Sequence, residues 1–134
     1  MASILIDSDV LIDYLRGEPI IVTHLQQLDA VGDLLCTCDI VVAEVESGLS
    51  PTQSAAARRL MSSLVVLERN IAASHQAGRW RYDYARKGIT LSTPDALIAA
   101  TAISNVAGIL TRNLSHFPMP ELTVLPGPSR PPRR

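Results

Sequence analysis

Three carboxylates stand in stretches of sequence that are otherwise apolar. Asp7 closes the apolar run 4–6, Glu44 lies among valines, and Asp95 begins an Ala-rich stretch. Burying a carboxylate costs several kcal/mol unless its charge is paired. One divalent cation held by acids from three distant parts of the chain would offset that cost, and oxygen ligands suit Mg²⁺ or Mn²⁺. Such an ion can activate a water and neutralise charge that develops on a phosphate, so the pattern indicates phosphate-ester hydrolysis.

Each acid also has a simpler interpretation when it is considered alone. Asp7 could cap the helix that follows it, and Asp95 could complement the dipole of its own helix. Glu44 could be a surface residue at the edge of its helix. The metal site is favoured because the three acids occur together.

The elements that must position these acids follow from the apolar periodicity. We expect strands at residues 3–7, 34–37, 65–67, 108–111 and 122–125. We expect helices at residues 10–15, 18–30, 39–49, 51–64, 71–86 and 93–105, the fourth with Pro51 in its first turn and the last capped by Thr93. This alternation predicts the α/β class, a three-layer α/β/α sandwich with a central, mostly parallel sheet of about five short strands. Sites in such sheets form beyond the carboxyl ends of the strands, where Asp7 and residues 111–113 are expected.

Four segments carry a family resemblance through their order and spacing. They are residues 4–13 (ILIDSDVLID), 42–48 (VAEVESG), 93–102 (TPDALIAATA) and 110–117 (LTRNLSHF). Together they resemble the PIN-domain ribonucleases, in particular the VapC-type toxins of type II toxin–antitoxin systems. The resemblance extends over nearly the whole chain except its tail.

The resemblance implies a PIN-like fold and an endoribonuclease that hydrolyses RNA with a metal-activated water. Asp7, Glu44 and Asp95 would be the catalytic and metal-binding acids, with Mg²⁺ or Mn²⁺ as the cofactor. It also implies a cognate VapB-type antitoxin, whose tail lies across the acidic groove, and assembly as a homodimer.

The fourth segment departs from the pattern of the family, in which many members carry a further acid. Here the segment offers Asn113, Ser115 and His116 and no carboxylate. Asn113 can donate a carbonyl oxygen or hold a water, but it brings no charge, which favours one metal ion over two. We predict substrate contacts for Asn113 and for Arg112, whose cation could meet a phosphate. Asp9 could supply the missing charge, or it could cap the helix or face solvent.

Two other functions remain open from the sequence. A catalytically degenerate PIN module would bind RNA or a partner without cutting it. A phosphatase of the haloacid-dehalogenase type would use Asp7 as its nucleophile and Asp9 as its acid/base. That class needs a later Lys and an acidic pair, whereas the chain offers Lys87 and no acid beside Asp95.

Composition bounds the remaining questions. With 134 residues, the chain has the length of one domain, which we place at 1–126, followed by a Pro/Arg-rich tail at 127–134 that we expect to be disordered. The net charge of −1 is not typical of a nucleic-acid-binding protein. A local basic cluster could either contact RNA or form a solvated helix face, and it consists of Arg79, Arg81, Arg86 and Lys87. No membrane span or leader is visible, and we read Cys36 and Cys38 as buried thiols of a cytoplasmic protein.

Overall fold

A sheet of five short parallel strands lies at the centre of the computed structural model, which describes residues 2–129. The strands are β1 (Ser3–Ile6), β2 (Leu34–Thr37), β3 (Val65–Val66), β4 (Gly108–Thr111) and β5 (Val124–Pro126). Their order is β3-β2-β1-β4-β5, and every neighbouring pair is parallel. Because both faces of a parallel sheet are covered, β1 is apolar at every residue from Ile4 to Ile6, and all three are buried.

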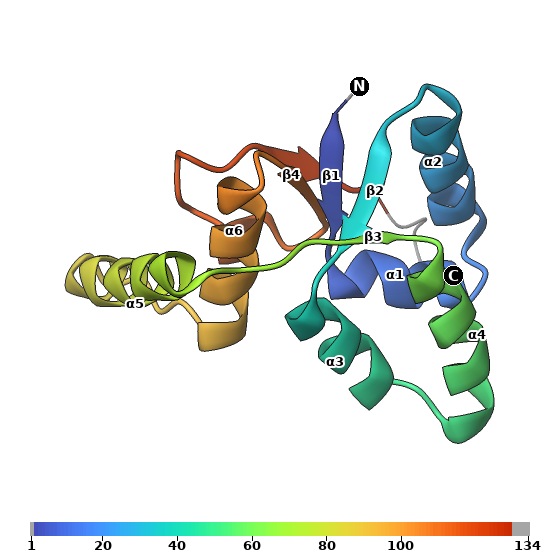
Figure 1. Cartoon of the computed structure of the whole chain (residues 1–134), viewed down its shortest axis with the longest axis horizontal. Helices are drawn as coiled ribbons and strands as arrows, with labels where there is room; N and C mark the ends of the chain where they lie inside the picture. The colour runs from blue at the N-terminus through green and yellow to red at the C-terminus, as the bar shows by residue number, and fades with distance from the viewer. Residues whose placement is uncertain (1, 130–134) are drawn as a thin grey trace.

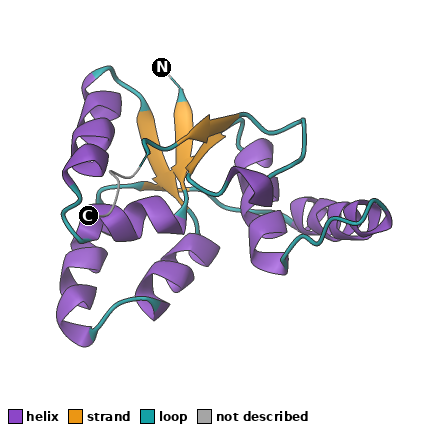
Figure 2. Cartoon of the chain, turned by 180° about the vertical axis from the view of Figure 1, so that it is seen from behind, coloured by secondary structure: helices purple, strands orange, loops and turns teal. Residues whose placement is uncertain are grey.

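Helices cover the sheet on two sides and complete the predicted three-layer α/β/α sandwich. They are α1 (Ser8–Leu15), α2 (Pro19–Ala30), α3 (Asp39–Ser47), α4 (Pro51–Ser62), α5 (Ile71–Arg86) and α6 (Thr93–Ser104). Figures 1 and 2 show α1 to α4 gathered on one side of the strands and α5 and α6 on the other, with α5 projecting outward. No helix in residues 2–129 is long and apolar enough to cross a membrane.

The core is built mostly from aliphatic side chains of β1, β4 and the helices that face them. Leu5 stands opposite Cys36 on one side and Ile109 on the other. Cys36 and Cys38 are both free and buried, as predicted. Helix α6 is rich in alanine, and its small side chains allow it to pack closely against both β4 and α5.

Several element boundaries differ from the sequence prediction, and each has a local cause. Helix α4 begins at Pro51 as predicted, with Ser50 and Gln53 in a capping box, but it ends at Ser62 and not at 64, because the Ser63 N–H and hydroxyl both donate to the Leu60 carbonyl. Strand β5 begins at Val124 and ends at Pro126, which an edge strand tolerates. The cap of α6 is Ser92 and not Thr93, since the Ser92 Oγ accepts from the Asp95 N–H at 3.1 Å.

The predicted tail divides into two parts. Residues 127–129 continue from β5, and the Gly127 N–H donates to the Thr111 carbonyl at 2.8 Å. Residues 130–134 lie outside the described residues.

Helix α6 ends in a strained turn at Val106. The Ala107 N–H donates to the Ala102 carbonyl at 2.8 Å, which is a Schellman arrangement, and Val106 occupies its left-handed position with φ 54°. A β-branched residue is disfavoured there, and the Val106 side chain is 91% exposed, so burial does not compensate for the strain.

We therefore expect Val106→Gly to stabilise the fold by about 0.5–1 kcal/mol. The left-handed conformation costs a non-glycine residue about 1–2 kcal/mol, and the greater freedom of glycine in the unfolded chain offsets part of that gain. Urea unfolding measures the change, and Val106→Ala is the matched control, because alanine keeps the backbone strain. A Val106→Gly midpoint at or below that of the wild type would contradict the assignment of strain to this turn.

Candidate active site

Asp7 is fixed at the carboxyl edge of the sheet by hydrogen bonds with β4 and with the start of α1. It follows β1 directly, and its backbone N–H donates to the Leu110 carbonyl of β4 at 2.9 Å. One carboxylate oxygen accepts from the Ser8 N–H at 2.8 Å, and the other accepts from the Thr111 hydroxyl at 2.7 Å. Asp7 therefore caps α1, as its simpler interpretation proposed, and at the same time presents a carboxylate that is held in one orientation.

The pKa of Asp7 is raised well above that of an ordinary aspartate, because the carboxylate is buried. Burial and the like charges of Asp9 and Asp95 together raise it from 3.8 to about 6, against the opposing hydrogen bonds from Thr111 and Ser8. Asp95, which is distant in sequence, is thus near enough for its charge to act on Asp7.

Glu44 joins the same group of acids from α3. Burial raises its pKa, and repulsion from Asp95 and Asp9 adds to that effect, whereas a hydrogen bond with the Ser8 side chain lowers it. Its Oε1 atom is buried and has no hydrogen-bond partner among the described residues. A buried carboxylate oxygen without a partner is costly, so this atom is suited to bind a cation or accept a hydrogen bond from a water.

Asp95 lies in the first turn of α6, where the Ser92 cap and Pro94 set the start of the helix. Its Oδ2 atom is 3.3 Å from Nδ1 of His116, which belongs to the short 3₁₀ helix η1 (Leu114–His116) after β4. The Asp95 side chain is 19% exposed, so one side of the group of acids remains open to a ligand.

The donor chemistry of these acids fits a hard divalent cation. Among residues 2–129, no group of three or more His, Cys, Asp or Glu side chains lies close enough together to hold a metal ion. Mg²⁺ does not need three such ligands, because it commonly takes one or two carboxylates and keeps several waters. Asp7 and Asp95 can serve as those carboxylates, and the unpartnered oxygen of Glu44 can bind an ion or one of its waters.

Asn113 lies beside the acids, but its amide is engaged with Asp9. Its Nδ2 atom donates to Asp9 Oδ2 at 3.2 Å, and its backbone N–H donates to the Thr111 hydroxyl at 3.0 Å. The Thr111 hydroxyl thus links Asn113 to Asp7. The predicted contact of Asn113 with substrate stays a prediction, while its contact with Asp9 is a feature that sequence reasoning did not assign.

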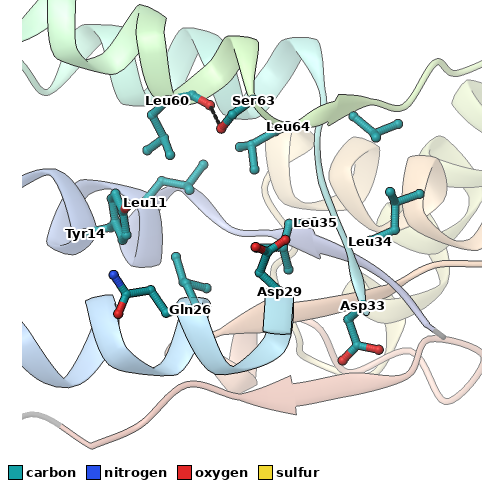
Figure 3. Close-up of a pocket in the computed structure, with 12 residues that line it drawn as sticks. Leu11, Tyr14, Gln26, Asp29, Asp33, Leu34, Leu35, Leu60, Ser63 and Leu64 are labelled. Carbon is teal, nitrogen blue, oxygen red and sulfur yellow. Dashed lines mark hydrogen bonds between the residues drawn. The ribbon is translucent and has the colours of Figure 1, made fainter. Parts of the chain in front are cut away.

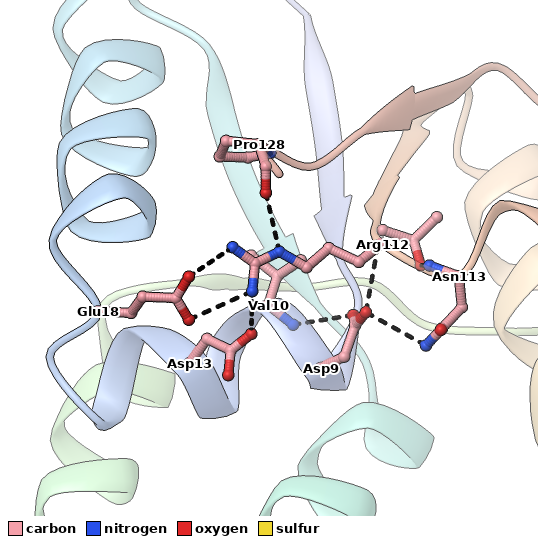
Figure 4. Close-up of polar contacts among 8 residues, drawn as sticks. Asp9, Val10, Asp13, Glu18, Arg112, Asn113 and Pro128 are labelled. Carbon is pink, nitrogen blue, oxygen red and sulfur yellow. Dashed lines mark hydrogen bonds and ion pairs between the residues drawn. The ribbon is translucent and has the colours of Figure 1, made fainter. Parts of the chain in front are cut away.

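Arg112 directs its guanidinium towards an acidic pair outside this group (Figure 4). It forms ion pairs with Asp13 of α1 and with Glu18, the latter at 2.8 Å, and its Nε donates to the Pro128 carbonyl at 3.0 Å. The Arg112 side chain is 11% exposed, and these contacts raise its pKa. The predicted phosphate contact of Arg112 stays untested, and this structure shows the side chain bound within the protein.

The family model described as PIN domain matches residues 4–117, which contain every acid of the site. The chain belongs to the PIN-domain family. This PIN domain is 36% identical to Ribonuclease VapC19 of Mycobacterium tuberculosis over 86% of the chain and 92% of that protein. It is 33% identical to Ribonuclease VapC10 of the same species over 87% of the chain and 86% of that protein.

Solved structures show the same fold at lower sequence identity. VapBC2 of Rickettsia felis, bound to a DNA fragment from its promoter, has a TM-score of 0.81 at 21% identity and covers 92% of this chain and 98% of that one. DNA-bound VapBC of Salmonella typhimurium has a TM-score of 0.79 at 24% identity and covers 94% and 98%. These likenesses support the three-layer fold of this PIN domain.

Sequence reasoning missed two residues that hold the site in place. Asp13 is 3% exposed although it is charged, and a buried charge requires a partner, which is Arg112. Its position on α1 between the apolar residues Leu11 and Tyr14 was the available signal. Thr111 was expected at the edge of the sheet, but its bond to Asp7 depends on the pairing of β1 with β4.

The basic helix α5 has one aromatic side chain packed inward and another exposed beside its arginines. Trp80 is buried against the core, as expected for a structural aromatic residue. Tyr82 is 52% exposed, and the guanidinium groups of Arg79 and Arg86 lie 4.8 and 4.3 Å from the centre of its ring. The outer face of α5 therefore carries an exposed cation–aromatic cluster.

A separate apolar hollow of about 270 Å³ opens between α1, α2, α4 and β2 (Figure 3). Leu11, Leu60 and Leu64 line it, and Asp29 and Asp33 stand at its acidic side. None of the three predicted acids borders it. This hollow is therefore separate from the group of predicted acids at the edge of the sheet.

The raised pKa of Asp7 predicts a pH dependence in the metal-free protein. Between about pH 4 and pH 6 the folded carboxyl keeps its proton after the unfolded carboxyl has lost it, so stability falls as the pH rises. The fall attributable to Asp7 is about 2–3 kcal/mol. Asp7→Asn, which cannot titrate, should lack it, and urea unfolding with a chelator over this range measures both proteins. Parallel stability curves for the two proteins would contradict the assigned environment of Asp7.

Proposed function

We propose that this PIN domain is a divalent-metal-dependent endoribonuclease and the toxin of a VapBC-type pair. The observation that carries the proposal is the convergence of Asp7 and Asp95 at one edge of the sheet, with the unpartnered Glu44 oxygen in the same group. The ribonuclease names of the curated relatives support the activity, and the family match supports the site.

The cofactor in this proposal is Mg²⁺ or Mn²⁺, held by Asp7 and Asp95, with Glu44 helping directly or through water. When bound, the ion supplies an activated water and offsets charge on the phosphate. The protein contributes orientation, since Thr111 and the Ser8 N–H fix both oxygens of Asp7. The free oxygen of Glu44 can accept a hydrogen bond from the attacking water.

The proposed reaction is hydrolysis of an RNA phosphodiester bond by in-line attack. The water oxygen forms a new bond to phosphorus while the bond from phosphorus to the 3′ oxygen breaks. The 3′ oxygen takes up a proton, so the products carry a 5′-phosphate and a 3′-hydroxyl. Because this route needs no 2′-hydroxyl as nucleophile, a 2′,3′-cyclic phosphate should not appear.

The proposed partners are RNA, a cognate VapB-type antitoxin and a second copy of the chain. Support for an antitoxin comes from the solved neighbours, several of which are described as VapBC complexes. The group of acids would attract a basic residue of the antitoxin, which would then compete with the metal for Asp7 and Asp95. Sedimentation velocity at micromolar concentration tests the homodimer, and a single monomeric species would remove it.

The test of the activity is cleavage of pooled total RNA by purified wild-type protein and by Asp95→Asn. We expect discrete fragments with Mg²⁺ or Mn²⁺, none with a chelator, and a loss of about 100-fold or more in the variant. Asp83→Asn is the matched control, because Asp83 is an exposed acid on α5 outside the site.

Two results would contradict the proposal in different ways. Equal cleavage by the wild type and Asp95→Asn would show that the activity does not use this site. No cleavage by the wild type, together with no rise in melting temperature on addition of millimolar metal, would favour the degenerate binding module.

A further inference from the structure

Asp9 is anchored from the opposite end of the sequence. It belongs to the first turn of α1, where its Oδ1 accepts from the Val10 N–H at 2.8 Å. Its Oδ2 accepts two further bonds from the segment after β4, from the Arg112 N–H at 3.1 Å and from the Asn113 amide at 3.2 Å (Figure 4). A local bond at the start of a helix accounts for only one of these contacts, and the other two fix the carboxylate from a distant segment.

The segment that supplies these donors is itself fastened by the Arg112 side chain. Its guanidinium binds Asp13 on the next turn of α1 and Glu18 at the start of α2, while Nε binds the Pro128 carbonyl. Gly127 passes so close that an added Cβ would lie 3.0 Å from Arg112 Cγ. The Arg112 side chain thus binds α1, α2 and the chain after β5. Its backbone N–H donates to Asp9.

Asp9 is also linked to the proposed metal-binding acids by a chain of hydrogen bonds. Asn113 donates its amide to Asp9 and its backbone N–H to the Thr111 hydroxyl, which in turn donates to Asp7 at 2.7 Å. The charge of Asp9 acts on Asp7 and on Glu44, whose buried Oε1 atom has no partner among the described residues. Without a cation, a further carboxylate at this place adds to the repulsion. The three hydrogen bonds on Asp9 and the ion pairs behind them therefore maintain an arrangement that a bound cation would favour.

We propose that Asp9 contributes negative charge to the metal site and that Arg112 is a positioning residue, which holds Asp9 there through its own N–H and the neighbouring Asn113 amide. The inference rests on the proposed function, because it assigns two more residues to the same site. It gives Arg112 a role through Asp9, in place of a direct contact with phosphate. Asn113 carries no charge of its own, and its side-chain amide acts as the second hydrogen-bond donor to Asp9.

The experiment is Mn²⁺ binding to the full chain without RNA, followed by the electron paramagnetic resonance signal of free Mn²⁺. Asp9→Asn removes the charge and keeps the size of the side chain. Arg112→Lys keeps the positive charge and removes the fork that binds Asp13 and Glu18 together. We expect each variant to weaken Mn²⁺ binding by about tenfold or more, as is typical when a support of a metal ligand is lost.

The double variant separates positioning from a general loosening of the fold. If Arg112 acts through Asp9, the double variant binds Mn²⁺ no more weakly than Asp9→Asn alone. Arg69→Lys is the matched control, since Arg69 forms a similar forked pair with Asp39 and makes no contact with Asp9, and its Mn²⁺ affinity should stay within about twofold of the wild type. Should Arg112→Lys fail to fold by circular dichroism, Glu18→Gln weakens the same fork from its more exposed end and replaces it.

Each outcome bears on a separate claim. Unchanged Mn²⁺ affinity in Asp9→Asn overturns the role of Asp9, and additive losses in the double variant overturn positioning by Arg112. A wild-type protein that binds no Mn²⁺ contradicts the proposed function itself, independently of both variants.

Discussion

Carboxylates gather at one edge of the sheet, and their mutual repulsion must be balanced by the groups around them. Asp7, Asp9, Glu44 and Asp95 act on one another although they come from three helices and the end of a strand. In a chain without a cation this arrangement is unfavourable, and burial makes it more so. The protein limits the cost by surrounding the acids with donors, including the Ser8 N–H, the Thr111 hydroxyl and the Arg112 N–H.

The parallel sheet explains why so few residues are needed to assemble the site. Because β1 and β4 are neighbours and run in the same direction, Asp7 and Thr111 emerge at the same edge, and one hydroxyl can hold the carboxylate. Helices that begin at this edge add Asp95 and bring Glu44 from α3. Away from the group of acids, the Arg112 side chain forms ion pairs with Asp13 and Glu18. These ion pairs support the segment after β4 that contacts Asp9.

The places of the three acids on their strand and helices could be predicted from the sequence, because charge in an apolar context is a local signal that needs no tertiary information. The parallel sheet followed from the alternation of strands and helices, and the PIN-domain family followed from four short segments. The direction of the Arg112 side chain could not be predicted, because it depends on where Asp13 and Glu18 lie in space. In the sequence, Arg112 is simply a cation beside an acidic site, and a phosphate contact was the natural expectation.

The details of helix ends show a similar limit of local reasoning. Ser92 and Thr93 are both hydroxyl residues before Pro94, and only the backbone at the start of α6 decides that Ser92 accepts from Asp95. Val106 likewise gives no sequence signal of a left-handed turn, because a β-branched residue is a poor choice there. The packing of α6 against β4 and α5 fixes where the helix must end, and the residue at that position takes the required conformation.

Anomalous scattering from crystals soaked with Mn²⁺ would locate the proposed metal ion. We expect a peak bounded by Asp7 and Asp95, with the free Glu44 oxygen facing the ion or one of its waters. A difference map from Asp95→Asn crystals prepared in the same way should show that peak reduced or absent. A well-ordered site with no anomalous peak, in which the acids contact only protein and water, would rule out a metal ion held by these acids.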